Sequence, residues 1–443
     1  MTRPLRVAFA TLGCKVNQYD TATTQTALAG DCEVVPFAEG ADVYVVNSCT
    51  VTDRADAESR QLARRARRLN PGGRVILTGC FAQTSPQRAD LPEVDYVIGV
   101  GRLPDLLRAV RDQIPADEGR VLVSNLRKAE AVTVLGAETF AGQTRAFLKV
   151  QEGCDLFCTF CIVPMARGRS RSVPPRRVLA ELERLAELGF REAVLTGIHL
   201  GGYGKDLQPA LTLADLVEMI AEVAPLPRIR LSSIDPPEVT PRLLDLVARS
   251  PVLCEHLHMP VQAGADGVLR RMRRLYDAAL VRDVAAEIHR RLPDAGLGTD
   301  VIAGFPGRAR PSTPPPPRCC RRRGSATCTS FPTRGGAGRR PPRRPIICRR
   351  RSSGRAQGLR RIGRAQREAF AARCVGRELE VLVESTRDSA TGRLVGYSRN
   401  NQRVVLDGPD GLANHAVRVR AVARGGDRVL GERVDEGDAA PPR

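Results

Sequence analysis

Short apolar runs alternate with polar, helix-like stretches along the N-terminal part of the chain. The runs VAFAT, VYVVN and RVILT occupy residues 7–11, 43–47 and 74–78. The stretch DRADAESRQLARRARRLN after the second run is acidic at its start and basic at its end, as the dipole of a helix favours. Because strands that alternate with helices form parallel sheets, we predict a parallel α/β domain over residues 3–115, with a linker over 116–139.

The same alternation continues over residues 140–370 as a repeated strand–loop–helix unit. Amphipathic stretches such as RRVLAELERLAELG separate the expected strands. Repeated units of this kind close into a full or partial (β/α) barrel whose site lies at the carboxyl ends of the strands. We predict a partial (β/α)6 barrel, and an overall α/β fold class. The five strand candidates of this region are AFLKV, EAVLTG, RIRLSS, EHLHMP and GTDVIAG, at 146–150, 192–197, 228–233, 255–260 and 298–304.

From Arg377 the pattern changes to short alternating strands separated by turns rich in Gly, Asn and Asp. This pattern predicts a small five-stranded, all-β barrel over residues 374–437. Four of its arginines are candidate contacts for nucleic-acid phosphates, although an exposed charged face on a β-barrel is ordinarily only solvated. They are Arg399, Arg403, Arg418 and Arg420.

The tract 308–354 follows neither the strand period nor the helix period. It holds 14 arginines and nine prolines, and no Asp, Glu or Lys. Without these arginines the net charge of +20 falls to +6, so the charge is poor evidence for a nucleic-acid partner. Taken alone, the tract is typical of a disordered basic arm. A barrel needs a helix and a sixth strand at this point, however, and we hypothesise a shifted reading frame that begins near Gly307 and ends near Gly354.

A shifted frame has a specific consequence for the barrel. With one choice of synonymous codons, the segment CTSFPTR, at residues 328–334, reads in another frame as His-Val-Phe-Pro-Tyr-Ser, which is a plausible sixth strand. If the cell makes the chain as written, we expect the barrel to lack its sixth strand and the helix before it.

Cysteine usage points to metal chemistry in a reducing compartment. The N-terminus shows no signal-peptide run, and no stretch approaches the ~18 apolar residues of a membrane span. We therefore expect a cytoplasmic protein with no membrane partner. There, the chain's thirteen cysteines are more naturally ligands or buried thiols than disulfides.

Three cysteines follow the three N-terminal strands. Cys14, Cys49 and Cys80 each come just after a predicted strand, and the carboxyl ends of parallel strands lie along one edge of a sheet. Three converging thiolates suit an iron–sulfur cluster or zinc. The alternative is that each is a buried free thiol that acts as a small hydrophobe, which is our interpretation of Cys32.

Three more cysteines lie together in CDLFCTFC, after the first barrel strand. The spacing Cys154-x3-Cys158-x2-Cys161 allows one loop to hold a cubane by three irons and to leave the fourth iron open to a small molecule. Structural zinc sites use four ligands, usually as two cysteine pairs. No second pair follows at that spacing, although a zinc knuckle or reactive thiols remain as alternatives. After the second strand, the glycines of TGIHLGGYG (196–204) permit close approach of a ligand to the backbone.

These motifs resemble those of the radical S-adenosylmethionine (SAM) enzymes. TLGCKVNQYD (11–20), NSCTVT (47–52) and TGC (78–80) are similar to the N-terminal domain of the methylthiotransferase branch, and SSIDP, HLHMPVQAGAD and TDVIAGFPG to its barrel motifs. GCKVNQYD is most similar to the MtaB type, which modifies N6-threonylcarbamoyladenosine at position 37 of tRNA. The C-terminal module resembles the TRAM domain, an OB-like RNA-binding barrel.

The resemblance implies two [4Fe–4S] clusters and SAM as cofactors. Cys154, Cys158 and Cys161 would ligate the cluster that binds SAM and splits it into methionine and a 5′-deoxyadenosyl radical. That radical would remove hydrogen from C2 of the adenine. Cys14, Cys49 and Cys80 would ligate the second cluster, which carries the sulfur. The implied SAM pocket contains Thr196, Gly197, Gly201, Gly202 and Gly204.

The implied partners are adenosine 37 in the tRNA anticodon loop, an electron donor and a sulfur source. Two alternatives stay open. One is a sibling methylthiotransferase that acts on isopentenyladenosine-37 of tRNA or on a ribosomal-protein aspartate. The other is an inactive RNA-binding relic whose barrel the tract 308–354 has disrupted.

Two histidines lie in the fourth strand candidate. We interpret His256 and His258 as structural residues.

Overall fold

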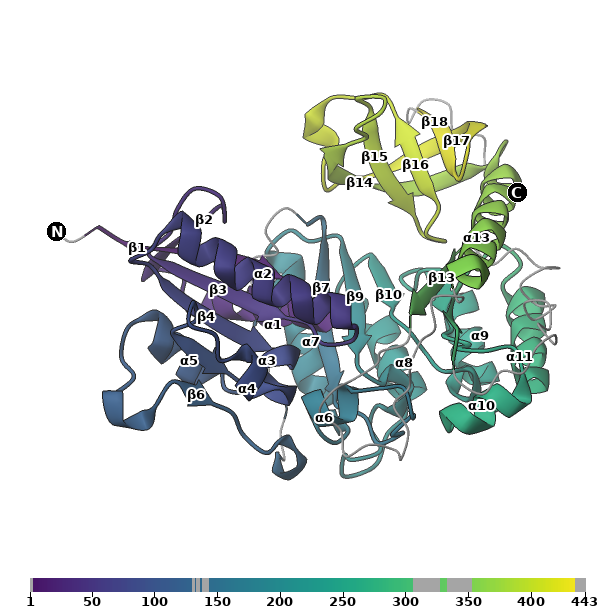
Figure 1. The fold of residues 1–443 in the computed structure, drawn as a ribbon. Coiled ribbons are helices and arrows are strands. Elements are labelled where there is room, and N and C mark those ends of the chain that lie inside the picture. Colours follow the sequence, from purple (N-terminus) through teal and green to yellow (C-terminus); the bar gives the residue numbers. More distant parts are fainter. Residues whose placement is uncertain are drawn as a thin grey trace.

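The computed structural model describes residues 3–129, 132, 136–137, 143–305, 327–332 and 353–434 (Figure 1). Most of the predicted linker's second half and most of the tract 308–354 lie outside these residues. The N-terminal sheet and its helices lie beside a central curved sheet with helices, and the small C-terminal barrel follows the long helix α13 (Figure 1). Among the described residues, no helix combines the length and the apolar character that a membrane span requires.

The N-terminal domain is a six-stranded, fully parallel sheet in the order β2-β1-β3-β4-β5-β6. The central strand β3 is buried along its whole length, as a parallel strand covered on both faces requires. The last strand, β6, falls within the predicted linker. The strands are β1 (Leu5–Thr11), β2 (Cys32–Val35), β3 (Val43–Ser48), β4 (Arg74–Gly79), β5 (Tyr96–Ile98) and β6 (Val121–Leu122).

The helices of this domain follow the strands. The Thr52 hydroxyl caps the N-terminus of α2, which has Asp53 and Asp56 in its first turn and Arg67 and Arg68 in its last. The helix that this charge order predicts is therefore confirmed. The helices are α1 (Lys15–Ala27), α2 (Asp53–Leu69), α3 (Cys80–Thr84), α4 (Pro86–Ala89) and α5 (Leu103–Val110).

The central domain is the predicted partial barrel. Parallel strands β7, β9 and β10 form one sheet, and parallel strands β11, β12 and β13 form another. Bridges from Ile229 to Leu253 and from Ser233 to His258 join the two sheets, so six parallel strands run in sequence order. These strands are β7 (Arg145–Glu152), β9 (Glu192–Gly197), β10 (Arg228–Leu231), β11 (His256–His258), β12 (Gly296–Ala303) and β13 (Thr327–Pro332); β8 (Arg171–Ser172) is antiparallel to β7.

Helices surround this curved sheet. Apolar residues of the strands and of the flanking helices form one continuous core, which includes Leu148, Leu182, Leu195 and Leu244. The helices are α6 (Val163–Arg167), α7 (Pro175–Glu187), α8 (Leu213–Val223), α9 (Pro241–Arg249), α10 (Asp266–Met272), α11 (Ala278–Arg291) and α13 (Ser353–Cys374). Short 3-10 turns occur at 116–118, 126–128, 200–202, 236–238 and 410–412.

The expectation that the barrel lacks its sixth strand is wrong for residues 327–332. These residues form β13, which pairs in parallel with β12 from Gly298–Thr327 to Ala303–Pro332 and contacts α13. Strand pairing uses backbone groups that almost any sequence supplies, and Thr and Phe favour strands. Pro332 is the last residue of β13, which lies at the edge of the described sheet, and proline is tolerated on edge strands.

The C-terminal domain is a closed five-stranded barrel in the order β14-β15-β16-β18-β17, as predicted. It docks on the central barrel through buried arginines: Arg228 donates to the Tyr397 carbonyl at 3.0 Å and Arg230 to the Arg399 carbonyl at 2.8 Å. Both arginines also pair with Glu192. The strands are β14 (Glu378–Arg387), β15 (Leu394–Ser398), β16 (Arg403–Leu406), β17 (Ala416–Gly425) and β18 (Arg428–Arg433).

Candidate metal centres

The three dispersed cysteines converge at the carboxyl edge of the N-terminal sheet. They follow β1, β3 and β4, which are neighbours in the sheet. The Asn17 Oδ1 atom lies 4.0 Å from the Cys14 Sγ and 3.9 Å from the Cys80 Sγ. A Cβ atom on Gly13 would lie 2.9 Å from the Cys49 Sγ. The three thiols therefore surround one small region, as the strand pattern predicts, while metal binding by them stays a prediction.

Two asparagines and a glycine shape this region. Asn17 donates from Nδ2 to the carbonyls of Leu12 and Ser48, at 2.7 and 3.0 Å, and Asn47 donates to the Asn17 carbonyl at 2.9 Å. Gly79 has φ of +90°, and a Cβ atom there would lie 2.4 Å from Asn47 Oδ1. Only glycine fits, because L side chains rarely adopt this conformation. Sequence pattern alone does not single out either asparagine, although the stretches GCKVN and VVNSC contain them.

Burial raises the pKa of two of these three thiols. Cys49 and Cys80 are buried, whereas Cys14 is exposed. Burial raises the pKa of the Cys80 thiol to about 12, against the opposing effect of Arg167, and also raises the pKa of Cys49. A metal that binds here therefore displaces protons as it binds. The Arg167 Nε–H, 3.3 Å from the Cys80 Sγ, is positioned to donate to the resulting thiolate.

The second trio, Cys154, Cys158 and Cys161, lies in the loop between β7 and α6 and is called the loop trio below. The Cys161 backbone N–H donates to the Cys158 carbonyl at 3.0 Å, which closes a tight turn between these two cysteines. The Leu156 N–H lies 3.5 Å from the Cys154 Sγ, and the Arg274 Nη1 lies 3.2 Å from the Cys158 Sγ. Thiols of both trios therefore face N–H donors, which suits them to hold iron–sulfur clusters as thiolates. Burial raises the pKa of Cys154 to about 12.

The glycine-rich loop after β9 folds against other parts of the protein. A Cβ atom on Gly201 would overlap the Glu238 carboxylate, one on Gly202 would lie 2.7 Å from the His199 Nδ1, and one on Gly204 would lie 2.4 Å from the Leu211 carbonyl. Gly197 faces the Gln151 side chain, and Thr196 is buried. The glycines are thus required by protein neighbours. The assignment of this loop to a SAM pocket stays a prediction.

A polar group that the sequence analysis missed lies beside this loop. The ligand atoms of His199, Asp235 and Glu238 lie within 4.8 Å of one another, and the His199 Nε2 is 2.6 Å from a Glu238 oxygen. Arg274 forms an ion pair with Asp235 and also contacts Cys158. Arg274 therefore links this group to the loop trio. The sequence signals were the TGIHLGGYG motif, which contains His199, and the SSIDP motif, which contains Asp235.

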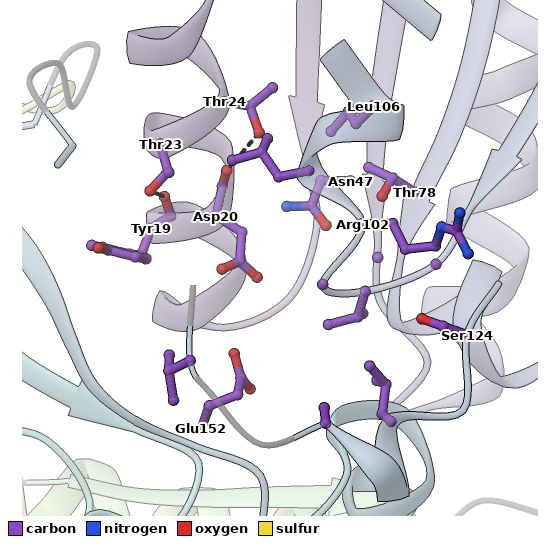
Figure 2. Close-up of a pocket in the computed structure, with 18 of the residues that line it drawn as sticks. Tyr19, Asp20, Thr23, Thr24, Asn47, Thr78, Arg102, Leu106, Ser124 and Glu152 are labelled. Carbon is purple, nitrogen blue, oxygen red and sulfur yellow. Dashed lines mark hydrogen bonds between the residues drawn. The ribbon is translucent and has the colours of Figure 1, made fainter. Parts of the chain in front are cut away.

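A cavity of about 310 Å³ lies between the N-terminal domain and β7 (Figure 2). In Figure 2, Asp20 of α1 and Glu152 of β7 border it from the two domains, and Asn47 and Thr78 border it from the ends of β3 and β4. None of the six candidate ligand cysteines or the five candidate SAM-pocket residues, all within the described part of the chain, belongs to its lining.

The remaining candidates have structural partners. The Arg399 Nη2 donates to the carbonyls of Pro251 and Leu253, at 2.6 and 2.8 Å. Arg403 pairs with Asp388, and Arg418 and Arg420 both pair with Glu378. His256 is buried, and burial holds its pKa well below the usual value, while His258 is hydrogen-bonded to Ser233 at 2.8 Å. These contacts agree with structural roles for the histidines.

Two family models match the chain: Uncharacterized protein family UPF0004 over residues 6–99 and the Radical SAM superfamily over residues 148–310. The threonylcarbamoyladenosine tRNA methylthiotransferase MtaB of Bacillus subtilis is 36% identical over 425 residues, which cover 95% of this chain and 94% of that protein. The tRNA-2-methylthio-N(6)-dimethylallyladenosine synthase of Moorella thermoacetica is 31% identical over 438 residues, which cover 96% of this chain and 97% of that protein.

The solved structures add evidence on the fold. The radical SAM methyltransferase TsrM from Kitasatospora setae, with cobalamin and a [4Fe-4S] cluster bound, superposes with a TM-score of 0.52 at 15% sequence identity. The match covers 74% of this chain and 75% of that chain. At this identity the likeness supports the fold alone.

Proposed function

The chain belongs to the family of radical SAM methylthiotransferases of the MtaB type, and we propose that it adds a methylthio group to C2 of N6-threonylcarbamoyladenosine at position 37 of tRNA. The observation that carries the proposal is the gathering of two cysteine trios in a chain that matches MtaB proteins over nearly its full length. The C2–H bond of adenine is beyond the reach of acid–base catalysis, so this reaction requires a cofactor that supplies radical chemistry.

Each trio has a defined role in the proposal. Cys154, Cys158 and Cys161 would hold one [4Fe–4S] cluster, and Cys14, Cys49 and Cys80 would hold the other. When bound, the clusters and SAM supply the radical, the sulfur and the methyl group. The protein contributes N–H donors to the cysteine sulfurs, from Arg274 and Arg167, and it buries three of the six ligands away from water.

The rest of the chain would bind the substrates. Thr196, Gly197, Gly201, Gly202 and Gly204 would line the SAM pocket at the carboxyl ends of the barrel strands, the face on which barrel active sites lie. The C-terminal barrel, within residues 374–437, would bind the tRNA near its anticodon loop, where an unpaired adenine can be splayed out for recognition. The chemistry further requires an electron donor and a sulfur source, and we place the reaction in the cytoplasm.

The comparisons favour the threonylcarbamoyladenosine substrate over its sibling. Relatives of the MtaB type are 32–39% identical, whereas the dimethylallyladenosine synthases are 30–32% identical. Mass spectrometry of tRNA nucleosides from a strain without the gene tests this choice. Complementation with the chain should restore the 2-methylthio form of N6-threonylcarbamoyladenosine, and complementation with a Cys158→Ala variant should not. Restoration of only the methylthiolated isopentenyladenosine would overturn the assignment.

The inactive-relic alternative needs a separate experiment. Anaerobic reconstitution with iron and sulfide, followed by incubation with SAM and dithionite, should give about eight iron atoms per chain and release 5′-deoxyadenosine. Binding of tRNA with no cleavage of SAM would support the relic instead.

A further inference from the structure

Arg167 follows one cysteine trio in the sequence and contacts the other in space. It ends α6, the five-residue helix that begins just after Cys161 in the loop trio. Its side chain is 1% exposed. The Nε–H donates to the Cys80 Sγ of the dispersed trio at 3.3 Å, and the Nη2 group donates to the Asn17 Oδ1. One guanidinium therefore contacts both a candidate ligand and the asparagine that this trio surrounds.

Carboxylates from two domains fix the third nitrogen of this guanidinium. The Arg167 Nη1 lies 2.7 Å from Asp20 of α1 and 3.2 Å from Glu152 of β7. The Lys149 ammonium bridges the same two carboxylates, at 2.7 and 3.0 Å. Because the guanidinium is planar and always charged, these contacts fix both its orientation and its positive charge beside Cys80.

We propose that Arg167 is a positioning residue for a cluster at Cys14, Cys49 and Cys80, and that its N–H···S contact with Cys80 raises the reduction potential of that cluster. This inference rests on the proposed function, which places a cluster there. Reduction adds negative charge to a cluster, and a buried positive charge that donates a hydrogen bond to a ligand sulfur stabilises the reduced form. Arg274, which contacts Cys158 at 3.2 Å, holds the equivalent place at the loop trio.

The two arginines make a reciprocal experiment possible. One parent protein carries Cys154→Ala, Cys158→Ala and Cys161→Ala, and keeps only the dispersed trio; the other carries Cys14→Ala, Cys49→Ala and Cys80→Ala. Each parent receives Arg167→Gln or Arg274→Gln. After anaerobic reconstitution, iron is counted and the midpoint potential is followed by electron paramagnetic resonance. In the first parent, Arg167→Gln should shift the potential to more negative values and Arg274→Gln should not. In the second parent, Arg274→Gln should give the larger shift.

The conservative variant Arg167→Lys adds a second readout. It keeps the charge but loses the planar array of donors, so its potential should lie between those of the first parent and Arg167→Gln. If Arg167→Gln keeps its iron and its potential, the inference is overturned while the cluster assignment stands. Loss of iron from both Arg167 variants also contradicts the inference. Removing the N–H donor to one sulfur leaves all three cysteine ligands in place, so the cluster should still bind. If the first parent itself binds no iron, the cluster assignment in the proposed function fails.

Discussion

Replacing Glu192 by Gln should destabilise the junction between the two barrels. Glu192 is fully buried between Arg228 and Arg230, whose Nε atoms lie 2.8 and 2.7 Å from its two oxygens. Burial alone would raise the pKa of this carboxyl, but the two arginines lower it from 4.5 to about 2. At about 1.4 kcal/mol per pKa unit, the charged carboxylate stabilises the fold by roughly 3 kcal/mol.

This magnitude agrees with a loss of about 3–5 kcal/mol when one partner of a buried ion pair is removed. The contribution is fully present above the unfolded-state pKa, near 4.5, and is lost as the pH falls toward 2. Urea unfolding of the iron-free protein at pH 7, followed by circular dichroism, should therefore give a clearly lower midpoint for Glu192→Gln.

Glu378 offers a matched control. It also pairs with two arginines, Arg418 and Arg420, but its side chain is 36% exposed. Exposed ion pairs contribute little to stability, so Glu378→Gln should leave the midpoint almost unchanged. Equal midpoints for the two variants would refute the reasoning, because burial would then not decide the strength of these pairs.

Three further predictions concern the cysteines and the anomalous tract. Gly79→Ala, which places a Cβ atom 2.4 Å from Asn47 Oδ1, should lower the iron content by about half and spare the loop trio; a full iron content would contradict this account of the dispersed trio. Cys32→Ala, in edge strand β2, should leave the iron content unchanged, and loss of a cluster would make Cys32 a ligand. Resequencing the gene across codons 300–360 should reveal a frame that restores the family pattern between 308 and 354, whereas a clean frame that encodes this same chain would end the frameshift hypothesis.

The sequence predicted the strands that carry long apolar runs. The runs at 7–11, 43–47 and 74–78 became β1, β3 and β4, because buried parallel strands require apolar side chains on both faces. Strand β2 escaped prediction because it lies at the edge and is largely exposed, and β6 because it has only two residues. Strand β13 was missed because its partner, not its own pattern, specifies it.

In the candidate sites too, some features follow from the sequence and others depend on contacts between distant parts of the chain. Convergence of Cys14, Cys49 and Cys80 follows from one rule about the carboxyl edge of a parallel sheet. The N–H donors at the cysteine sulfurs could not be predicted from the sequence. The contact of Arg167 with Cys80 spans 87 residues, and that of Arg274 with Cys158 spans 116. The glycines of 196–204 suggested room for a ligand, yet the nearest atoms belong to the protein itself, and only the folded chain reveals which neighbour a glycine accommodates.

The iron content of anaerobically reconstituted protein tests the central claim most directly. The intact chain should bind about eight iron atoms, and the Cys14→Ala, Cys49→Ala, Cys80→Ala variant about four, with the characteristic spectrum of a single [4Fe–4S] cluster. About four iron atoms in the intact chain, or the same number in both proteins, would contradict the assignment of two clusters to two cysteine trios.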